Sequence, residues 1–279
     1  MHTPRRRSAE GSARIVVLLA ALIVLGLIAV PVAAIFAFAF ERGVEPALAV
    51  LTRSDVHAAM GLSALAAAFT VPFVTVFGAA VAWVVTRTEL PGRKLLLAFV
   101  NVPFAVPPVV SGLLVILTLG PRTPVGAWFG SLGIPICFAP PAVILATALV
   151  SLGVVAKDLV PLLETLGPAE EIAARALGAT PAQAFWRVTM PGLRLPLLHA
   201  AVGALARALG EFGSVTVVSG RIRGETMTVP LLIEALYGEY DKTGAFALAA
   251  MLAVVALGAV GLKKTVELVL ARSAEKVTP

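Results

Sequence analysis

Charged residues are scarce in this sequence. They make up 14% of the 279 residues, and hydrophobic residues make up 59%, whereas ordinary soluble domains carry about 25% charged residues. The mean hydropathy of +0.96 also excludes a disordered chain, because such chains have too little apolar surface to fold. The scarcity of charge predicts a membrane protein, whose apolar runs leave no room for a soluble domain.

The residue types that carry catalysis or bind metals are also few. Cysteine occurs once, at Cys137, which excludes an internal disulfide and is typical of a small apolar core residue. The three histidines lie far apart, without metal-ligand or triad spacing. The segment 261–265 comes nearest to a phosphate-binding loop but lacks its glycine spacing. We therefore expect no catalytic residue, no metal, no cofactor and no ATP site in this chain.

Long stretches without charge are what the sequence does contain. Each is long enough to cross a hydrocarbon core of about 30 Å, which takes about 20 residues as a helix. They predict an all-α membrane protein with six membrane-spanning helices, the fifth of them interrupted by charge: 15–40, 58–86, 95–121, 123–156, 195–220 and 243–262. Prolines inside the first three spans predict kinks: Pro31, Pro72, Pro103, Pro107 and Pro108.

The basic residues predict the orientation. The 22 Lys and Arg residues exceed the 16 Asp and Glu residues, but they cluster beside the spans, so a nucleic-acid partner is not expected. Most of them fall on the side of the N-terminus, and the positive-inside rule then places both termini in the cytoplasm. We expect one membrane domain, 15–272, between cytoplasmic tails at 1–14 and 273–279.

The cytoplasmic connection between the fourth and fifth spans, about 166–196, has the punctuation of a helix-turn-helix. Gly178 is typical of the residue that ends a helix, and Thr180 followed by Pro181 predicts the start of a second helix, which runs until Pro191. The first helix carries a small apolar face, which packs either on a partner or on the chain's own helices. That face consists of Ala169, Ile172, Ala173, Ala176 and Leu177.

The same loop resembles the loop of bacterial ABC importer permeases, whose motif is Glu-Ala-Ala, three residues, Gly, nine residues and Ile-x-Leu-Pro. The matching residues are Ala173, Ala174, Gly178, Val188, Met190 and Pro191. Ile172 stands at the motif's glutamate position, and Glu171 lies one place earlier. In that family the loop inserts as a coupling helix into a cleft of the ATPase subunit. The resemblance implies the same role for this loop, without a specific salt bridge from Ile172.

The resemblance extends from about residue 45 to 270 and is to the sulfate/thiosulfate importer permeases of the W type. It is carried by the segments 71–78, 103–106, 108–113, 210–226 and 236–240. It implies a permease subunit in a bacterial inner membrane. It also implies partners: a paralogous permease or a second copy of this chain, two ATPase subunits that use ATP and Mg, an extracytoplasmic solute-binding protein, and membrane lipid.

Two sets of charged residues are candidates for contacts with solute or receptor. Arg207 and Glu211 are four residues apart inside the fifth span, where charge indicates function. Arg207 could offer its charge to a divalent oxyanion while Glu211 holds it, or the two could form an ion pair that pins the helix. Arg221, Arg223 and Glu225 lie in the next extracytoplasmic loop, which either contacts the receptor or is merely solvated.

The sequence therefore predicts a permease that imports sulfate by alternating access, with thiosulfate as a second candidate substrate. A molybdate or tungstate permease is the alternative within the class, because those permeases share the Gly-Glu-Phe-Gly element of 210–213. A self-contained secondary transporter would show an internal repeat, and a membrane enzyme would need a cluster of His, Asp or Cys. Neither pattern is evident in the sequence.

Overall fold

Helices and the loops between them make up the computed structural model, which describes residues 5–275 and contains no β-strand in that range. The long elements are α1 (Arg5–Ala39), α3 (Ser54–Arg87), α4 (Arg93–Ala105), α5 (Pro108–Leu119), α7 (Pro140–Ser151), α8 (Val154–Leu166), α11 (Met190–Leu209) and α14 (Lys242–Glu275). The short elements are α2 (Val44–Leu51), α6 (Pro124–Ser131), α9 (Ala169–Ala176), α10 (Pro181–Ala184), α12 (Gly213–Val218) and α13 (Val229–Gly238). A π-helix, Phe185–Thr189, joins α10 to α11. The predicted all-α fold is confirmed.

Five helical segments are long and apolar enough to cross a membrane, and the bent pair of α4 and α5 makes a sixth when it is counted as one span. The five are 16–39, 54–87, 140–166, 181–209 and 242–269. The predicted number of six spans is confirmed on that count. The chain is a multi-pass membrane protein.

The third span is broken where a kinked helix was predicted. α4 and α5 meet at an angle of 104° around Val106 and Pro107. Pro107 and Pro108 both lack the N–H that an α-helix needs, so the helical hydrogen bonds cannot continue through them. Pro108 instead opens a new helix, since proline suits the first helical position. The prolines marked the correct place, but the prediction of one continuous span over 95–121 was wrong.

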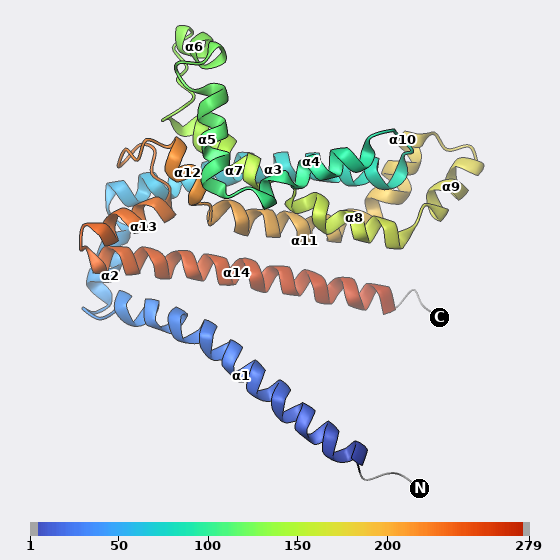
Figure 1. Ribbon diagram of the computed structural model, residues 1–279, viewed down its shortest axis with the longest axis horizontal. Coiled ribbons are helices and arrows are strands. Elements are labelled where there is room, and N and C mark those ends of the chain that lie inside the picture. The colour runs from blue at the N-terminus through green and yellow to red at the C-terminus, as the bar shows by residue number, and fades with distance from the viewer. Residues whose placement is uncertain (1–4, 276–279) are drawn as a thin grey trace.

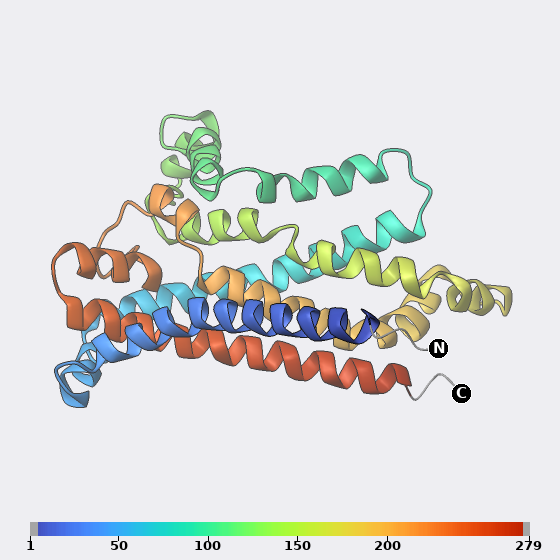
Figure 2. The same ribbon diagram turned by 60° about the horizontal axis from the view of Figure 1, so that its bottom comes forward.

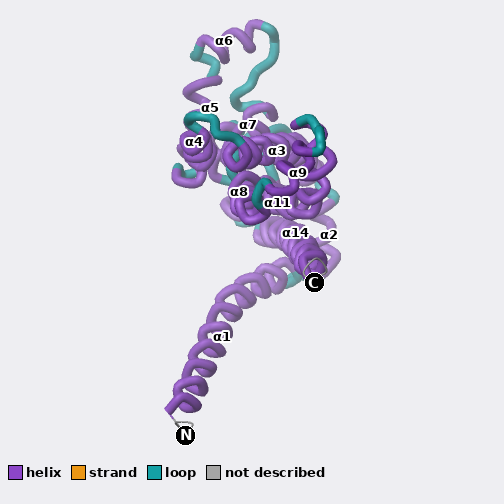
Figure 3. Tube along the Cα trace, turned by 90° about the vertical axis from the view of Figure 1, so that its right-hand side faces the viewer, coloured by secondary structure: helices purple, strands orange, loops and turns teal. Residues whose placement is uncertain are grey.

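The fourth predicted span, 123–156, is also corrected. Its first part forms α6, which stands away from the bundle (Figures 1 and 3), and the crossing helix is 140–166. Gly133 and Phe138 both have positive φ values, 74° and 62°, which turn the chain before Pro140 begins α7. The absence of charge did not mark these boundaries, because the turn residues are as uncharged as the helices.

The fifth span runs from Pro181 to Leu209, whereas 195–220 was predicted. Pro191 does not end the second helix of the loop. The N–H of Met190 donates to the carbonyl of Phe185, five residues back, and the helix continues as α11. Proline crowds the carbonyl of the fourth preceding residue, and the wider π turn immediately before Pro191 accommodates it. The span ends early because Gly210 terminates α11.

α3 lies at the centre of the bundle and packs against α7, α8 and α11. Gly78 permits the close approach of α3 to α8, because a Cβ there would lie 2.7 Å from the Cβ of Val155. α14 runs beside α11 and α13. α1 packs against α14 near its own C-terminal end, where Phe38 contacts Phe246, and diverges from the bundle toward its N-terminal end (Figures 1 and 3). The described chain ends and the α9–α10 loop lie at one end of the bundle, and α2 and α13 at the other (Figures 1 and 2).

α13 corrects the interpretation of the segment between the fifth and sixth spans as a charged loop. It is an apolar helix whose Leu231, Leu232 and Leu236 are fully buried beside α3 and α14. The charged residues on either side of α13 indicated a loop in the sequence, and the apolar run between them was too short to be recognised as a helix.

Candidate functional site

The loop between the fourth and fifth spans is built by local signals. Gly178 has φ +93°, and its N–H donates to the carbonyl of Arg175 while the N–H of Ala179 donates to that of Ala174, both at 3.0 Å. This is a Schellman ending, which satisfies carbonyls at the end of a helix. The side chain and backbone of Thr180 and Gln183 then form a reciprocal capping box that begins α10. Residues 169–184 therefore form two short helices joined by a tight turn.

The apolar face of α9 is not packed against the chain's own helices. No residue of α9 is buried, and Ile172 is 60% exposed and Leu177 90% exposed. Of the other residues that match the permease motif, Ala173 and Pro191 are exposed, whereas Ala174, Val188 and Met190 are half-buried. Exposed apolar faces of this kind are typical of sites that bind another protein. The alternative that the chain itself covers this face does not describe this structure.

Glu171 points toward the bundle and pairs with Arg87 at the end of α3. The Nε atom of Arg87 lies 2.9 Å from the Oε1 atom of Glu171. This pair could not be predicted from the sequence, because its members are 84 residues apart and no local pattern connects them.

Arg207 and Glu211 are close together, but not on one helical face as their spacing predicted. Arg207 lies in the last turn of α11, and Glu211 lies beyond Gly210, between α11 and α12. The Nη2 atom of Arg207 is 3.4 Å from the Oε2 atom of Glu211. The carboxylate is buried, with 2% of its side chain exposed, whereas 37% of the Arg207 side chain is exposed.

Glu211 is held chiefly by the start of α12. Its Oε1 atom accepts hydrogen bonds from the backbone N–H and from the hydroxyl of Ser214, both at 2.9 Å. Hydrogen bonds to a buried carboxylate offset the loss of its hydration. The carboxylate therefore has support that is independent of Arg207, whose own side chain is partly exposed.

Next to this pair, α12, which follows the fifth span, packs against α5 of the broken third span. A Cβ on Gly112 would lie 2.6 Å from the carbonyl oxygen of Ser214, and a Cβ on Gly213 would lie 2.8 Å from the Cβ of Pro108. Glycine therefore permits a backbone approach that any side chain would prevent. Sequence reasoning missed Gly112 and Ser214 as parts of this site. The available signal was the pairing of a small residue with glycine in both segments, Ser111-Gly112 and Gly213-Ser214.

The predicted receptor-facing arginines have partners within the chain. Arg221 pairs with Glu234, and Arg223 donates to both carboxylate oxygens of Glu239 at 2.7 Å. Glu225 is exposed and has no ion pair among the residues that the structure describes. These pairs connect the segment after α12 with α13 and with the residue that follows it.

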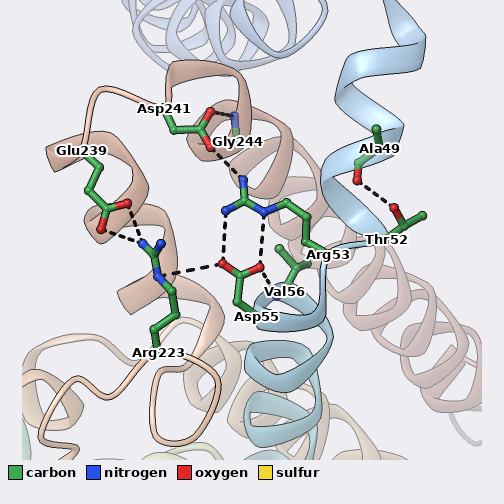
Figure 4. A network of polar contacts seen from close by, with 9 residues as sticks. All are labelled: Ala49, Thr52, Arg53, Asp55, Val56, Arg223, Glu239, Asp241 and Gly244. Carbon is green, nitrogen blue, oxygen red and sulfur yellow. Dashed lines mark hydrogen bonds and ion pairs between the residues drawn. The ribbon is translucent and has the colours of Figure 1, made fainter.

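A network of five charged side chains joins three chain segments at this end (Figure 4). Arg53, just before α3, donates to Asp241 at 2.8 Å and to Asp55 at 3.2 and 3.3 Å. The Nε atom of Arg223 lies 3.9 Å from Asp55, which brings Glu239 into the network. The network thus connects the start of α3, the segment after α12 and the turn between α13 and α14.

Asp241 also caps the start of α14, because its Oδ1 atom accepts a hydrogen bond from the N–H of Gly244 at 2.9 Å. Burial raises the pKa of the Asp241 carboxyl, but the N–H of Gly244 and the guanidinium of Arg53 outweigh that effect, so the pKa lies below its ordinary value. The hydrogen bond to Asp241 raises the pKa of Arg53 above its ordinary value, against the lowering effect of burial. Both shifts favour the charged forms that the network requires.

This shift predicts a pH dependence of stability. A carboxyl whose pKa is lower in the folded than in the unfolded protein contributes stability above the unfolded value, about 4, and loses it as the pH falls through the folded value. We expect the wild-type protein in detergent to melt at a higher temperature than the Asp241→Asn variant. The difference between the two melting temperatures should be constant near neutral pH and should shrink below about pH 4. A margin that does not change with pH would contradict a stabilising charge on Asp241.

Comparison with known proteins settles the family. The family described as "binding-protein-dependent transport system inner membrane component" matches residues 89–267. The chain belongs to this permease family. The chain is 43% identical over 237 residues to the sulfate transport system permease protein CysW of Synechocystis sp., covering 85% of this chain and 86% of the relative.

Other members of this permease family show the same relation. CysW of Escherichia coli is 43% identical over 238 residues, covering 85% of this chain and 82% of the relative. A second kind of permease protein, CysT of Synechococcus elongatus, is 36% identical over 197 residues, covering 71% and 69%. A solved bacterial alginate ABC transporter shares the fold, with a TM-score of 0.73 at 19% identity over 92% of this chain and 94% of that one. These relatives are transport proteins, in agreement with the predicted permease.

Proposed function

We propose that this chain is a permease subunit of an ATP-driven importer for sulfate. The observation that carries the proposal is 43% identity, over 85% of the chain, to relatives named as sulfate transport system permeases. Those names favour sulfate over molybdate or tungstate, the alternative oxyanions. Thiosulfate, which is also a divalent sulfur oxyanion, is a second candidate substrate.

The proposed complex contains this chain and a paralogous permease. Similarity to both CysW and CysT, two permease proteins of sulfate transport systems, favours two related but different subunits over two copies of one chain. Two ATPase subunits would use ATP and Mg, and a solute-binding protein would deliver the anion from the other side of the membrane. We place both termini and the α9–α10 loop in the cytoplasm of a bacterium, at the inner membrane, because most basic residues fall on that side.

In this proposal the exposed face of α9 docks on an ATPase subunit. The coupling loop that carries this face includes Ala173, Ala174, Gly178, Val188, Met190 and Pro191. Glu171 belongs to the same loop, but it pairs with Arg87 and faces the bundle rather than the ATPase. Movement of the loop would reorient the broken helices so that the pathway opens alternately to either side. Arg207, whose side chain is partly exposed, would present its guanidinium to the passing anion while Glu211 orients it. Arg221, Arg223 and Glu225 would lie on the face that receives the solute-binding protein.

Uptake of radiolabelled sulfate tests the substrate. Cells that lack this chain are expected to lose uptake, and the complemented strain is expected to recover it. In complemented cells, unlabelled thiosulfate should compete with sulfate and unlabelled molybdate should compete poorly. Intact sulfate uptake together with lost accumulation of molybdate would overturn the proposed substrate and favour the alternative oxyanion.

A further inference from the structure

Arg87, the last residue of α3, joins three elements through one side chain. Its Nε atom donates to Glu171 of α9 at 2.9 Å, its Nη1 to the carbonyl of Leu163 in α8 at 3.0 Å, and its Nη2 to the carbonyl of Gly167 at 2.8 Å. Only 5% of the Arg87 side chain is exposed. Each of the three guanidinium nitrogens has an acceptor of its own, whereas a lysine would have to reach all three acceptors from a single nitrogen.

Arg87 contacts the chain on both sides of a glycine turn. α8 ends at Leu166, and Gly167, with φ +65°, turns the chain toward α9. A cavity of about 200 Å³ lies beside this turn, with Arg87, Glu171 and Thr189 in its wall. The covalent connection between α8 and α9 is therefore a glycine turn beside open space, which would transmit force poorly. The ion pair between Arg87 and Glu171 is a direct and partly buried contact, with 16% of the Glu171 side chain exposed.

We propose that Arg87 is a positioning residue that transmits movement of α9 to α3 and α8. This inference rests on the proposed function, in which a partner ATPase moves α9. The exposed face of α9 is free to receive that partner, while Glu171, on another side of the helix, is tied to the bundle. Because α3 packs against α7, α8 and α11, a displacement of its end reaches most of the bundle.

A second route from the loop leads through α10 and the π-helix into α11 by the continuous chain. That route enters the bundle at α11, which packs against α3, α8 and α14. The Arg87 contacts add a direct connection from the loop to α3 and α8, so that these helices move with the loop without relying on α11. Loss of Arg87 would leave ATP hydrolysis possible but reduce the transport that accompanies it.

Three variants of the purified complete complex, reconstituted in proteoliposomes with its solute-binding protein, test this role. They are Glu171→Ala, Arg87→Gln and the double variant. Glu171→Ala removes only the contact with α9 and leaves the two bonds from Arg87 to backbone carbonyls. Arg93→Gln is the matched control, because Arg93 lies on the same side of the bundle and donates to the carbonyl of Thr88, outside the loop. The readout is sulfate imported per ATP hydrolysed, together with ATP hydrolysis in the absence of the solute-binding protein.

We expect Glu171→Ala and Arg87→Gln each to lower the ratio of sulfate to ATP by about fivefold, the lower end of usual coupling between sites. The ratio in the double variant should not fall below that of the more impaired single variant, since both changes break the same contact. Hydrolysis without the solute-binding protein and the amount of assembled complex should match the control, which a merely structural defect would not allow. If Arg87→Gln fails to assemble, Glu171→Ala alone decides.

Two results would overturn the role of Arg87. One is a wild-type ratio of sulfate imported to ATP hydrolysed in Glu171→Ala. The other is a double variant whose loss in this ratio equals the two single losses multiplied together. Either result leaves the proposed function intact, because the wild-type complex still imports sulfate. Failure of the wild-type complex to import sulfate would instead contradict the proposed function itself.

Discussion

Gly112→Ala is expected to disrupt the crossing of α5 and α12, although it adds only one methyl group. The new Cβ would lie 2.6 Å from the carbonyl oxygen of Ser214 and 3.0 Å from the Cβ of Val217. A backbone carbonyl cannot rotate away as the end of a side chain can, so α12 must move as a unit. Overpacking of this kind costs about 1–3 kcal/mol or more, which exceeds the gain of roughly 0.5–1 kcal/mol for replacing glycine by alanine within a helix.

Gly258→Ala is the matched control for this prediction. Gly258 also lies inside a long helix, α14, but a Cβ there would meet nothing within 4 Å. Its variant should be neutral or slightly stabilising. Thermal unfolding of the two purified variants in the same detergent gives the comparison. Equal melting temperatures would show that α5 and α12 are not in the close contact that the structure contains.

The parts of the fold that the sequence predicted correctly depend on local signals. Gly178 ends α9 and Thr180 begins α10 because a positive φ and a capping box involve only neighbouring residues. The number of spans follows from length and apolar composition in the same way. Length and apolar composition could not locate the boundaries of the fourth and fifth spans, because lipid-facing and buried positions are equally apolar. Val17 is 66% exposed and Leu231 is fully buried, yet both are apolar residues.

The candidate sites show the same limit. The spacing of Arg207 and Glu211 predicted their proximity correctly, but it predicted a continuous helix where Gly210 ends α11. The contact of Arg87 with Glu171 and that of Gly112 with Ser214 join residues that are remote in sequence. Such contacts arise from the packing of whole helices, which a single sequence does not specify by any local pattern.

Glu211→Ala and Arg207→Ala are expected to have different consequences, although the two residues form a pair. Glu211→Ala removes the acceptor of both hydrogen bonds from Ser214, and an unsatisfied buried group costs about 1–3 kcal/mol. Arg207→Ala leaves those bonds in place, and because the Arg207 side chain is 37% exposed its ion pair contributes little, about 0–1 kcal/mol. We therefore expect Glu211→Ala to lower the melting temperature clearly and Arg207→Ala to lower sulfate uptake with little effect on melting.

The double variant separates the two interpretations of this pair. If Glu211 serves mainly α12 and Arg207 mainly the anion, the double variant should melt like Glu211→Ala and transport no better than Arg207→Ala. If the two residues only neutralise each other, both single variants should be destabilised and the double variant should recover part of the loss. Ser214→Ala, which removes one of the two bonds to Glu211 and keeps the backbone N–H, should lie between wild type and Glu211→Ala in melting temperature. A partly exposed arginine whose counter-ion is held by other bonds is free to bind a passing anion, and the cycle measures this asymmetry between Arg207 and Glu211.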